Sequence, residues 1–283
     1  MTDPSARRRI SDRILTGLAW FCAFITVAVL AWILIYMIIK GAGHINWAFL
    51  TNVYKPVRDL YGIYPMIIST LMIIAVTVVI ATPIGICSAI YLVEYSKPGR
   101  LVNTIRFATE TLAGIPSIIY GLFGLVFFVI ALHLKYSILS GSLTLSIMVL
   151  PTVIRSTEEA LKSVPASYRE GSLALGATKL KTVSRVVLPS AIPGILTAVI
   201  LSIGRIVGET AAVYLTAGYV PNVPSSIMRS GRTLSVHLYT LAKEGISFDQ
   251  AYATATILVV IVAIINFIAT RLARRLSRAT TGG

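Results

Sequence analysis

The stretch EGSLALGATKLKTVSRVVLP, residues 170–189, is a polar segment between two long apolar ones. Just before it, Ser167 can serve as the N-cap of a helix, and Glu170 three positions later would complete a capping box. Gly176 suits the left-handed conformation in which many helices end. A second helical stretch follows and is expected to end at Pro189. The sequence therefore predicts a short helix, a glycine turn and another helix.

Apolar runs of the length needed to cross a bilayer lie on both sides of this stretch. Six spans are expected, at about residues 15–39, 65–92, 107–132, 142–154, 191–217 and 251–270. The fourth run is short, and Pro151 is expected within it or at its end, so the helix is expected either to be broken there or to extend past Arg155. The sequence predicts an all-α, polytopic membrane protein with a basic N-terminus (1–14), one transmembrane domain (15–278) containing the loop 155–190, and a disordered tail (279–283).

The composition also points to a bilayer. Of the 283 residues, 56% are hydrophobic and only 13% are charged, whereas a soluble domain carries about 25% charged residues. The net charge of +14 would suggest nucleic-acid binding in a soluble protein, but here the basic residues lie between apolar spans and are not interleaved with aromatic ones. We therefore expect contact with membrane lipid and none with nucleic acid.

The cysteines and histidines predict no metal site, because they form no cluster in the sequence. Cys22 and Cys87 fall inside apolar segments. The three histidines, His44, His133 and His237, lie in connecting segments far apart in the sequence, where they are expected at the surface.

The distribution of lysine and arginine predicts the orientation of the chain. If both termini lie inside, the inner segments carry 17 of these residues and the outer segments carry 7. Inner loops of membrane proteins are enriched in lysine and arginine. Both termini and the loop 155–190 are therefore expected in the cytoplasm, with the segments 41–64 and 218–250 outside.

The inner loop resembles the coupling loop of ABC-type importer permeases, whose pattern is Glu-Ala-Ala, three residues, Gly, nine residues, Ile, one residue, Leu-Pro. The matching positions are Glu170, Gly171, Ser172, Gly176, Val186, Leu188 and Pro189. The spacing agrees in full, with two small residues in place of the alanines and valine in place of isoleucine. The resemblance implies a type I importer permease fold and a loop that docks on a separate ATPase subunit.

No phosphate-binding GxxxxGK[ST] motif occurs in the chain. This chain is therefore expected to bind no cofactor and to be a transport subunit rather than an enzyme. ATP and magnesium are expected at the partner ATPase.

Two charges interrupt the fifth span. Arg205 lies near its midpoint, and Glu209, four residues later, would share its helix face. A charge at the centre of a span costs about 2.5–3.5 kcal/mol, so such residues are candidates for a functional site. Arginine suits an oxyanion because its planar donors fit phosphate or sulfate and it stays charged. The alternative is a structural salt bridge between Arg205 and Glu209.

A second pair with the same spacing stands at the start of the third span. Arg106 and Glu110 are secondary candidates for the substrate path. The alternative is an ordinary pair at the membrane interface, where a helix begins.

Three further stretches narrow the resemblance to phosphate-specific (Pst) uptake permeases. They are LAGIPSIIYGLFG (112–124), GRIVGETAAVYLTAG (204–218) and RTLSVHLYTLAKEG (232–245). The last is more similar to the A-type than to the C-type subunit. The resemblance implies a C-type partner permease, two copies of an ATPase, an external phosphate-binding protein and a bacterial or archaeal inner membrane. It also implies that Arg205 and Glu209 belong to the phosphate path.

Other functions remain open at this point. The chain could import another oxyanion, such as sulfate or molybdate, or could be the C-type partner. A membrane-embedded enzyme would need a nucleophile with a base or a metal cluster, and the spans show no such motif. A passive channel would need neither ATP nor a partner.

Overall fold

In the computed structural model, the residues described are 4–56, 60–97 and 99–281. They are helical apart from one antiparallel pair of two-residue strands and the connecting segments. The order is α1 (Pro4–Ala42), α2 (Trp47–Thr51), β1 (Tyr54–Lys55), β2 (Leu60–Tyr61), α3 (Tyr64–Ile90), the π-helix η2 (Tyr91–Tyr95), α4 (Arg100–Ala113), α5 (Ser117–Gly124), the π-helix η3 (Leu125–Ala131), α6 (Ile138–Lys162), α7 (Ala166–Ala174), α8 (Lys179–Thr182), the π-helix η4 (Val183–Val187), α9 (Leu188–Gly208), α10 (Ala211–Thr216), α11 (Leu234–Lys243) and α12 (Phe248–Thr281).

Five helical segments of this part of the chain are long and apolar enough to cross a membrane. They are Asp12–Ala42, Tyr64–Tyr95, Ile138–Lys162, Lys179–Gly208 and Phe248–Arg271. A sixth crossing is available if α4 counts together with α5 and η3, although this pair bends by 101°. The expected all-α, multi-spanning class is confirmed.

The third expected span, 107–132, is not one straight helix. Helix α4 ends at Ala113, and α5 begins at Ser117, directly after Pro116. Proline has no N–H and disfavours helical backbone in the residue before it, so the chain turns here. The hydroxyl of Tyr120 donates to the carbonyl of Leu112 at 2.7 Å and ties the two pieces together.

Prolines elsewhere do not end the helices in which they lie. Helix α6 continues through Pro151 to Lys162, so the fourth span is longer than the run 142–154 and extends past Arg155, the second of the two expected alternatives. The expected helix end at Pro189 is also wrong, because α8, η4 and α9 form one continuous span. The π-helical turn of η4 lies just before this proline and adjusts the hydrogen-bond pattern locally.

The fifth and last spans differ from expectation at their ends. The expected helix 191–217 is interrupted after Gly208, where Glu209 adopts an extended conformation, and α10 resumes at Ala211. The expected disordered tail 279–283 is helical as far as Thr281, where α12 ends; its last two residues lie outside the described part.

The polar loop contains the expected two helices, but its first helix starts differently. Pro165 precedes α7 and no side chain caps the helix, so the predicted capping box of Ser167 and Glu170 is wrong. Proline fixes φ at a helical value and is well suited to a helix start. Gly176 has a φ of +80°, which confirms its left-handed conformation after α7. Thr178 then caps α8.

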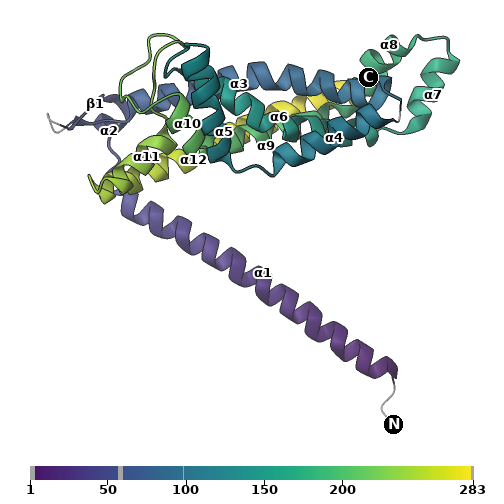
Figure 1. Ribbon diagram of the computed structural model, residues 1–283. Helices are drawn as coiled ribbons and strands as arrows, with labels where there is room; N and C mark the ends of the chain where they lie inside the picture. The colour runs from purple at the N-terminus through teal and green to yellow at the C-terminus, as the bar shows by residue number, and fades with distance from the viewer. Residues whose placement is uncertain (1–3, 57–59, 98, 282–283) are drawn as a thin grey trace.

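The core of the bundle is formed by α3, α6, α9 and α12. Helix α6 lies between α3 and α9, and its Leu145 and Met148 are fully buried. Helices α5 and α10 pack closely, because an added Cβ at Gly121 would lie 2.8 Å from the Cα of Ala212. Figure 1 shows α7 and α8 at one end of the bundle and β1, α2 and α11 at the other, while α1 packs on α12 and points away.

Candidate functional site

Arg205 and Glu209 lie on the two sides of a helix break. Arg205 is half-buried in the last turn of α9, and its Nη1 donates to Oγ1 of Thr152 on α6 at 3.5 Å. Glu209 follows the last residue of α9, and its Oε1 accepts from the backbone N–H of Ala212 at 3.2 Å. The two side chains form no ion pair, although the structure describes both. The expected i, i+4 arrangement fails because the helix ends before Glu209.

The break gives each charge a favourable local environment. The C-terminus of a helix carries partial negative charge, which stabilises the Arg205 guanidinium. Glu209 satisfies a backbone N–H in the first turn of α10, as N-terminal carboxylates do. The Glu209 carbonyl also accepts a hydrogen bond of 2.8 Å from the Ser235 hydroxyl on α11. Interrupted helices in transporters leave polar backbone groups available to substrates and ions.

A cavity of about 310 Å³ lies between α4 and α6. Its lining residues are Arg106, Thr109, Glu110, Ala113, Pro151, Thr152, Arg155, Ser156, Glu158, Glu159 and Lys162. Thr152 is also the side chain that Arg205 contacts. Arg205 thus lies next to the cavity wall without lining it. Arg205 and the pair of Arg106 and Glu110 are therefore in one region of the bundle, linked by α6.

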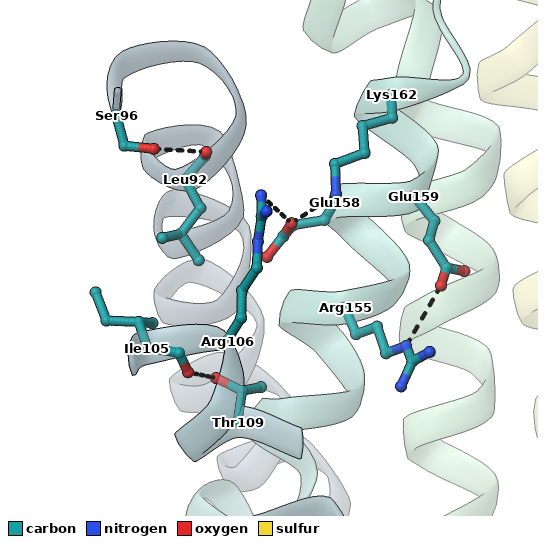
Figure 2. A network of polar contacts seen from close by, with 9 residues as sticks. All are labelled: Leu92, Ser96, Ile105, Arg106, Thr109, Arg155, Glu158, Glu159 and Lys162. Atoms are coloured by element: carbon teal, nitrogen blue, oxygen red, sulfur yellow. Dashed lines mark hydrogen bonds and ion pairs between the residues drawn. The ribbon is translucent and has the colours of Figure 1, made fainter. Parts of the chain in front are cut away.

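Glu158 forms salt bridges with two of the basic side chains that line the cavity (Figure 2). Its carboxylate accepts from Nη2 of Arg106 at 3.1 Å and from Nζ of Lys162 at 2.9 Å. The Glu158 side chain is only 9% exposed. Arg155 pairs separately with Glu159, at 3.4 Å.

The expected pairing of Arg106 with Glu110 is therefore wrong, since Arg106 pairs with Glu158. The order Arg-to-Glu along a helix is the weaker i, i+4 arrangement, whereas a buried carboxylate needs a cation. Sequence reasoning missed Glu158. Its spacing of four residues from Lys162 was a signal, but the contact with Arg106 depends on how α4 packs on α6.

The polar loop is fixed to the end of the bundle by Arg169 of α7. This guanidinium pairs with the buried Glu94 of η2 at 2.8 Å and donates to the carbonyls of Leu161 and Val164 at 2.8 and 2.7 Å. Ser172 and Thr182 join α7 to α8 through a hydroxyl hydrogen bond of 2.9 Å. Side-chain contacts therefore hold helix α7, which carries the first part of the coupling-loop motif, to the rest of the bundle.

The residues of the coupling-loop motif fall into two groups. Glu170, Gly171 and Gly176 are exposed, whereas Ser172 of α7 and Val186, Leu188 and Pro189 at the root of the loop are partly buried. Apolar side chains beside the motif face outward, since Leu175 is 90% and Leu180 69% exposed. The loop thus combines a rigid base with a partly apolar outer surface.

At the opposite end of the bundle, His237 is fully buried, so its expected surface position is wrong. Its Nδ1 accepts from Nη1 of Arg232 at 3.3 Å, and the ring packs edge-on against Tyr54 at 4.8 Å between centroids. Arg232 is also buried, and its Nε donates to the Tyr219 carbonyl at 2.6 Å. Burial, reinforced by the nearby Arg232 charge, lowers the pKa of His237 to about 3.

This lowered pKa predicts a loss of stability in acid. Between pH 6.5 and about 3 the folded protein keeps His237 neutral while the unfolded chain binds a proton. The free energy of unfolding should therefore fall by up to about 1.4 kcal/mol for each pH unit in this window. Thermal melting of the purified protein between pH 7 and 4.5 measures this loss of stability. His237→Asn should flatten the dependence, whereas the exposed His133→Asn should leave it unchanged; equal slopes for both would contradict the prediction.

No group of three or more His, Cys, Asp or Glu residues able to hold a metal ion occurs in residues 4–56, 60–97 and 99–281. The charged sites described above contain arginine, lysine and isolated carboxylates. The arginine and lysine side chains among them suit the binding of an anion.

Comparison with known proteins agrees with this arrangement. Residues 81–282 match the family model "Binding-protein-dependent transport system inner membrane component". The chain is 34% identical over 274 residues to the "Probable ABC transporter permease protein YqgI" of Bacillus subtilis, covering 92% of this chain and 93% of that protein. It is also 34% identical over 280 residues to the "Phosphate transport system permease protein PstA 1" of Mycobacterium tuberculosis strain CDC 1551, covering 94% of this chain and 91% of that protein.

The fold is also found among solved structures. A bacterial alginate ABC transporter, solved with an alginate pentasaccharide-bound periplasmic protein, matches with a TM-score of 0.65. The match covers 97% of this chain and 96% of that one at 15% sequence identity, and so concerns the fold alone. The family match and the full-length relatives show that the chain belongs to the inner membrane components of binding-protein-dependent transport systems, as a multi-pass permease subunit of an ABC importer.

Proposed function

We propose that this chain is the A-type permease subunit of an ATP-driven importer of inorganic phosphate. The observation that carries the proposal is the 34% identity to a phosphate transport permease along almost the entire length of both chains. The half-buried guanidinium of Arg205 is chemically consistent with it, since arginine binds phosphate through planar, permanently charged donors. Phosphate passes as an anion, without covalent chemistry.

In this proposal Arg205 is the contact for phosphate within the bundle. The break after Gly208 supports the role, because it leaves polar groups beside the guanidinium where a continuous helix would not. Glu209 holds the start of α10 through the backbone N–H of Ala212. Its function is thus to maintain the break, and to keep negative charge near the path so that phosphate is not bound too tightly.

Energy comes from a separate ATPase, present in two copies, which binds ATP and magnesium. Import of an anion against an inside-negative potential costs about 2.3 kcal/mol per charge per 100 mV, so an external energy source is required. Helix α7 and the Gly176 turn dock on the ATPase, which the exposed Leu175 and Leu180 support. Because α7 is braced by Arg169, its movement is transmitted to the spans as that of a rigid element.

The remaining partners are a C-type permease and an external phosphate-binding protein. Both termini and the coupling loop lie in the cytoplasm, as the distribution of lysine and arginine supports. The strands β1 and β2 and helix α11 then face outside, where the binding protein delivers phosphate. The membrane is the inner membrane of a bacterial or archaeal cell.

The test is uptake by the complete transporter reconstituted in vesicles, with the binding protein outside and ATP inside. Labelled phosphate should accumulate only with ATP, and excess unlabelled phosphate should suppress the signal while excess sulfate or molybdate does not. Suppression by sulfate or molybdate would identify a different oxyanion as the substrate. Uptake without ATP or the ATPase would contradict the coupled mechanism and indicate a channel.

A further inference from the structure

The cavity between α4 and α6 has the geometry of an anion site in which a carboxylate already occupies the ligand position. Glu158 lies between Arg106 of α4 and Lys162 of its own helix, at 3.1 and 2.9 Å. An oxyanion bound by the same two cations would accept the same hydrogen bonds, because phosphate and carboxylate oxygens have similar requirements. Figure 2 shows Glu158 projecting from α6 toward the Arg106 guanidinium.

Arg106 retains capacity for a further acceptor. Its Nε is buried and has no hydrogen-bond partner in the part of the chain that the structure describes. A buried donor without a partner is unfavourable, and an oxygen of an oxyanion that displaces the Glu158 carboxylate would satisfy it. The hydroxyls of Thr109, Thr152 and Ser156 also line the cavity, whose volume of about 310 Å³ leaves room for a small anion.

The cavity lies next to the proposed phosphate contact. Thr152 both lines the cavity and accepts the hydrogen bond from Arg205. From this point α6 runs through Glu158 to Lys162, which is its last residue before the coupling loop. An anion that leaves Arg205 in the direction of the coupling loop therefore meets Thr152 first and the Glu158 cluster next.

We propose that Arg106 and Lys162 form a second, low-affinity phosphate site on the cytoplasmic side, and that Glu158 competes with phosphate for both cations. This inference rests on the proposed function. When phosphate arrives, it replaces the Glu158 carboxylate as the ligand of Arg106 and Lys162. When the carboxylate rebinds these two cations, it displaces phosphate toward the cytoplasm. The competition keeps phosphate affinity low and prevents phosphate already in the cell from occupying the site.

The test uses the complete transporter in vesicles preloaded with different phosphate concentrations and with ATP. The initial rate of labelled phosphate uptake gives the internal phosphate concentration that halves transport. Glu158→Gln removes the competing charge, and this concentration should fall about tenfold, the effect of one lost charge-assisted contact. Glu159→Gln is the matched control, because it changes a neighbouring carboxylate of the same cavity whose salt bridge, among the described residues, is with Arg155 and not with Arg106 or Lys162.

Adding Arg106→Gln to Glu158→Gln should return the half-inhibiting concentration to the wild-type value or above. If Glu158→Gln fails to assemble, Arg106→Gln and Lys162→Gln should each raise this concentration about tenfold. Equal inhibition of wild type, Glu158→Gln and Glu159→Gln would overturn the second site, as would cation variants identical to wild type. A wild-type transporter that takes up no phosphate would instead overturn the proposed function.

Discussion

Arg205→Ala should almost abolish phosphate uptake by the reconstituted transporter while the complex still assembles. The side chain is half-buried, and its hydrogen bond to Thr152 is long, at 3.5 Å. It forms no salt bridge with another described residue. The loss of packing should therefore be small. Loss of a charge-assisted contact to phosphate should lower the uptake rate about 100-fold.

Two further variants separate charge from structure at this position. Arg205→Lys keeps the charge but loses the planar pair of donors, so it should retain a reduced rate. Arg185→Ala removes an exposed arginine of η4 and should transport normally. Labelled phosphate uptake is compared with the amount of assembled complex and its ATPase rate. Normal uptake by Arg205→Ala would show that the charge only stabilises the C-terminus of α9.

The sequence predicted the apolar spans well, because a bilayer imposes a long run of apolar residues wherever a helix crosses it. The interruptions were harder to predict. Pro151 and Pro189 lie inside continuous helices, whereas Pro116 marks a bend. The outcome depends on whether neighbouring helices, π-turns or side-chain hydrogen bonds satisfy the freed backbone groups, and such contacts are between distant segments.

The candidate site shows the same limit. Periodicity identified Arg205, Glu209, Arg106 and Glu110 as unusual charges, but it paired each with the residue four positions later. In the structure the break after Gly208 separates Arg205 from Glu209. Arg106 forms its salt bridge with the buried Glu158 instead of Glu110. His237 was likewise predicted at the surface. Its burial results from packing against Tyr54 and Arg232, and the sequence pattern does not show these contacts.

Arg169→Met should separate ATP hydrolysis from phosphate uptake. Arg169 is the ion-pair partner of Glu94, and it also binds two carbonyls at the junction of α6 and α7. Without these bonds α7 can move with the ATPase while η2 and the membrane span Tyr64–Tyr95, of which η2 is the last part, do not move with it. Phosphate transported per ATP hydrolysed should fall about tenfold, within the range of coupling free energies between sites.

The variant also leaves Glu94 buried without its cation, which is destabilising. The double variant Glu94→Gln with Arg169→Gln removes this unpaired charge, so it should assemble better than Arg169→Met and yet remain uncoupled, because the two carbonyl contacts are lost in both. Arg185→Met, at an exposed arginine nearby in the chain, should keep the wild-type ratio. Uptake and ATP hydrolysis are measured on the same vesicles. If the double variant transports as much phosphate per ATP hydrolysed as the wild type, α7 transmits force through its chain connections alone. The contacts of Arg169 with Glu94 and the two carbonyls would then serve only to fold the loop.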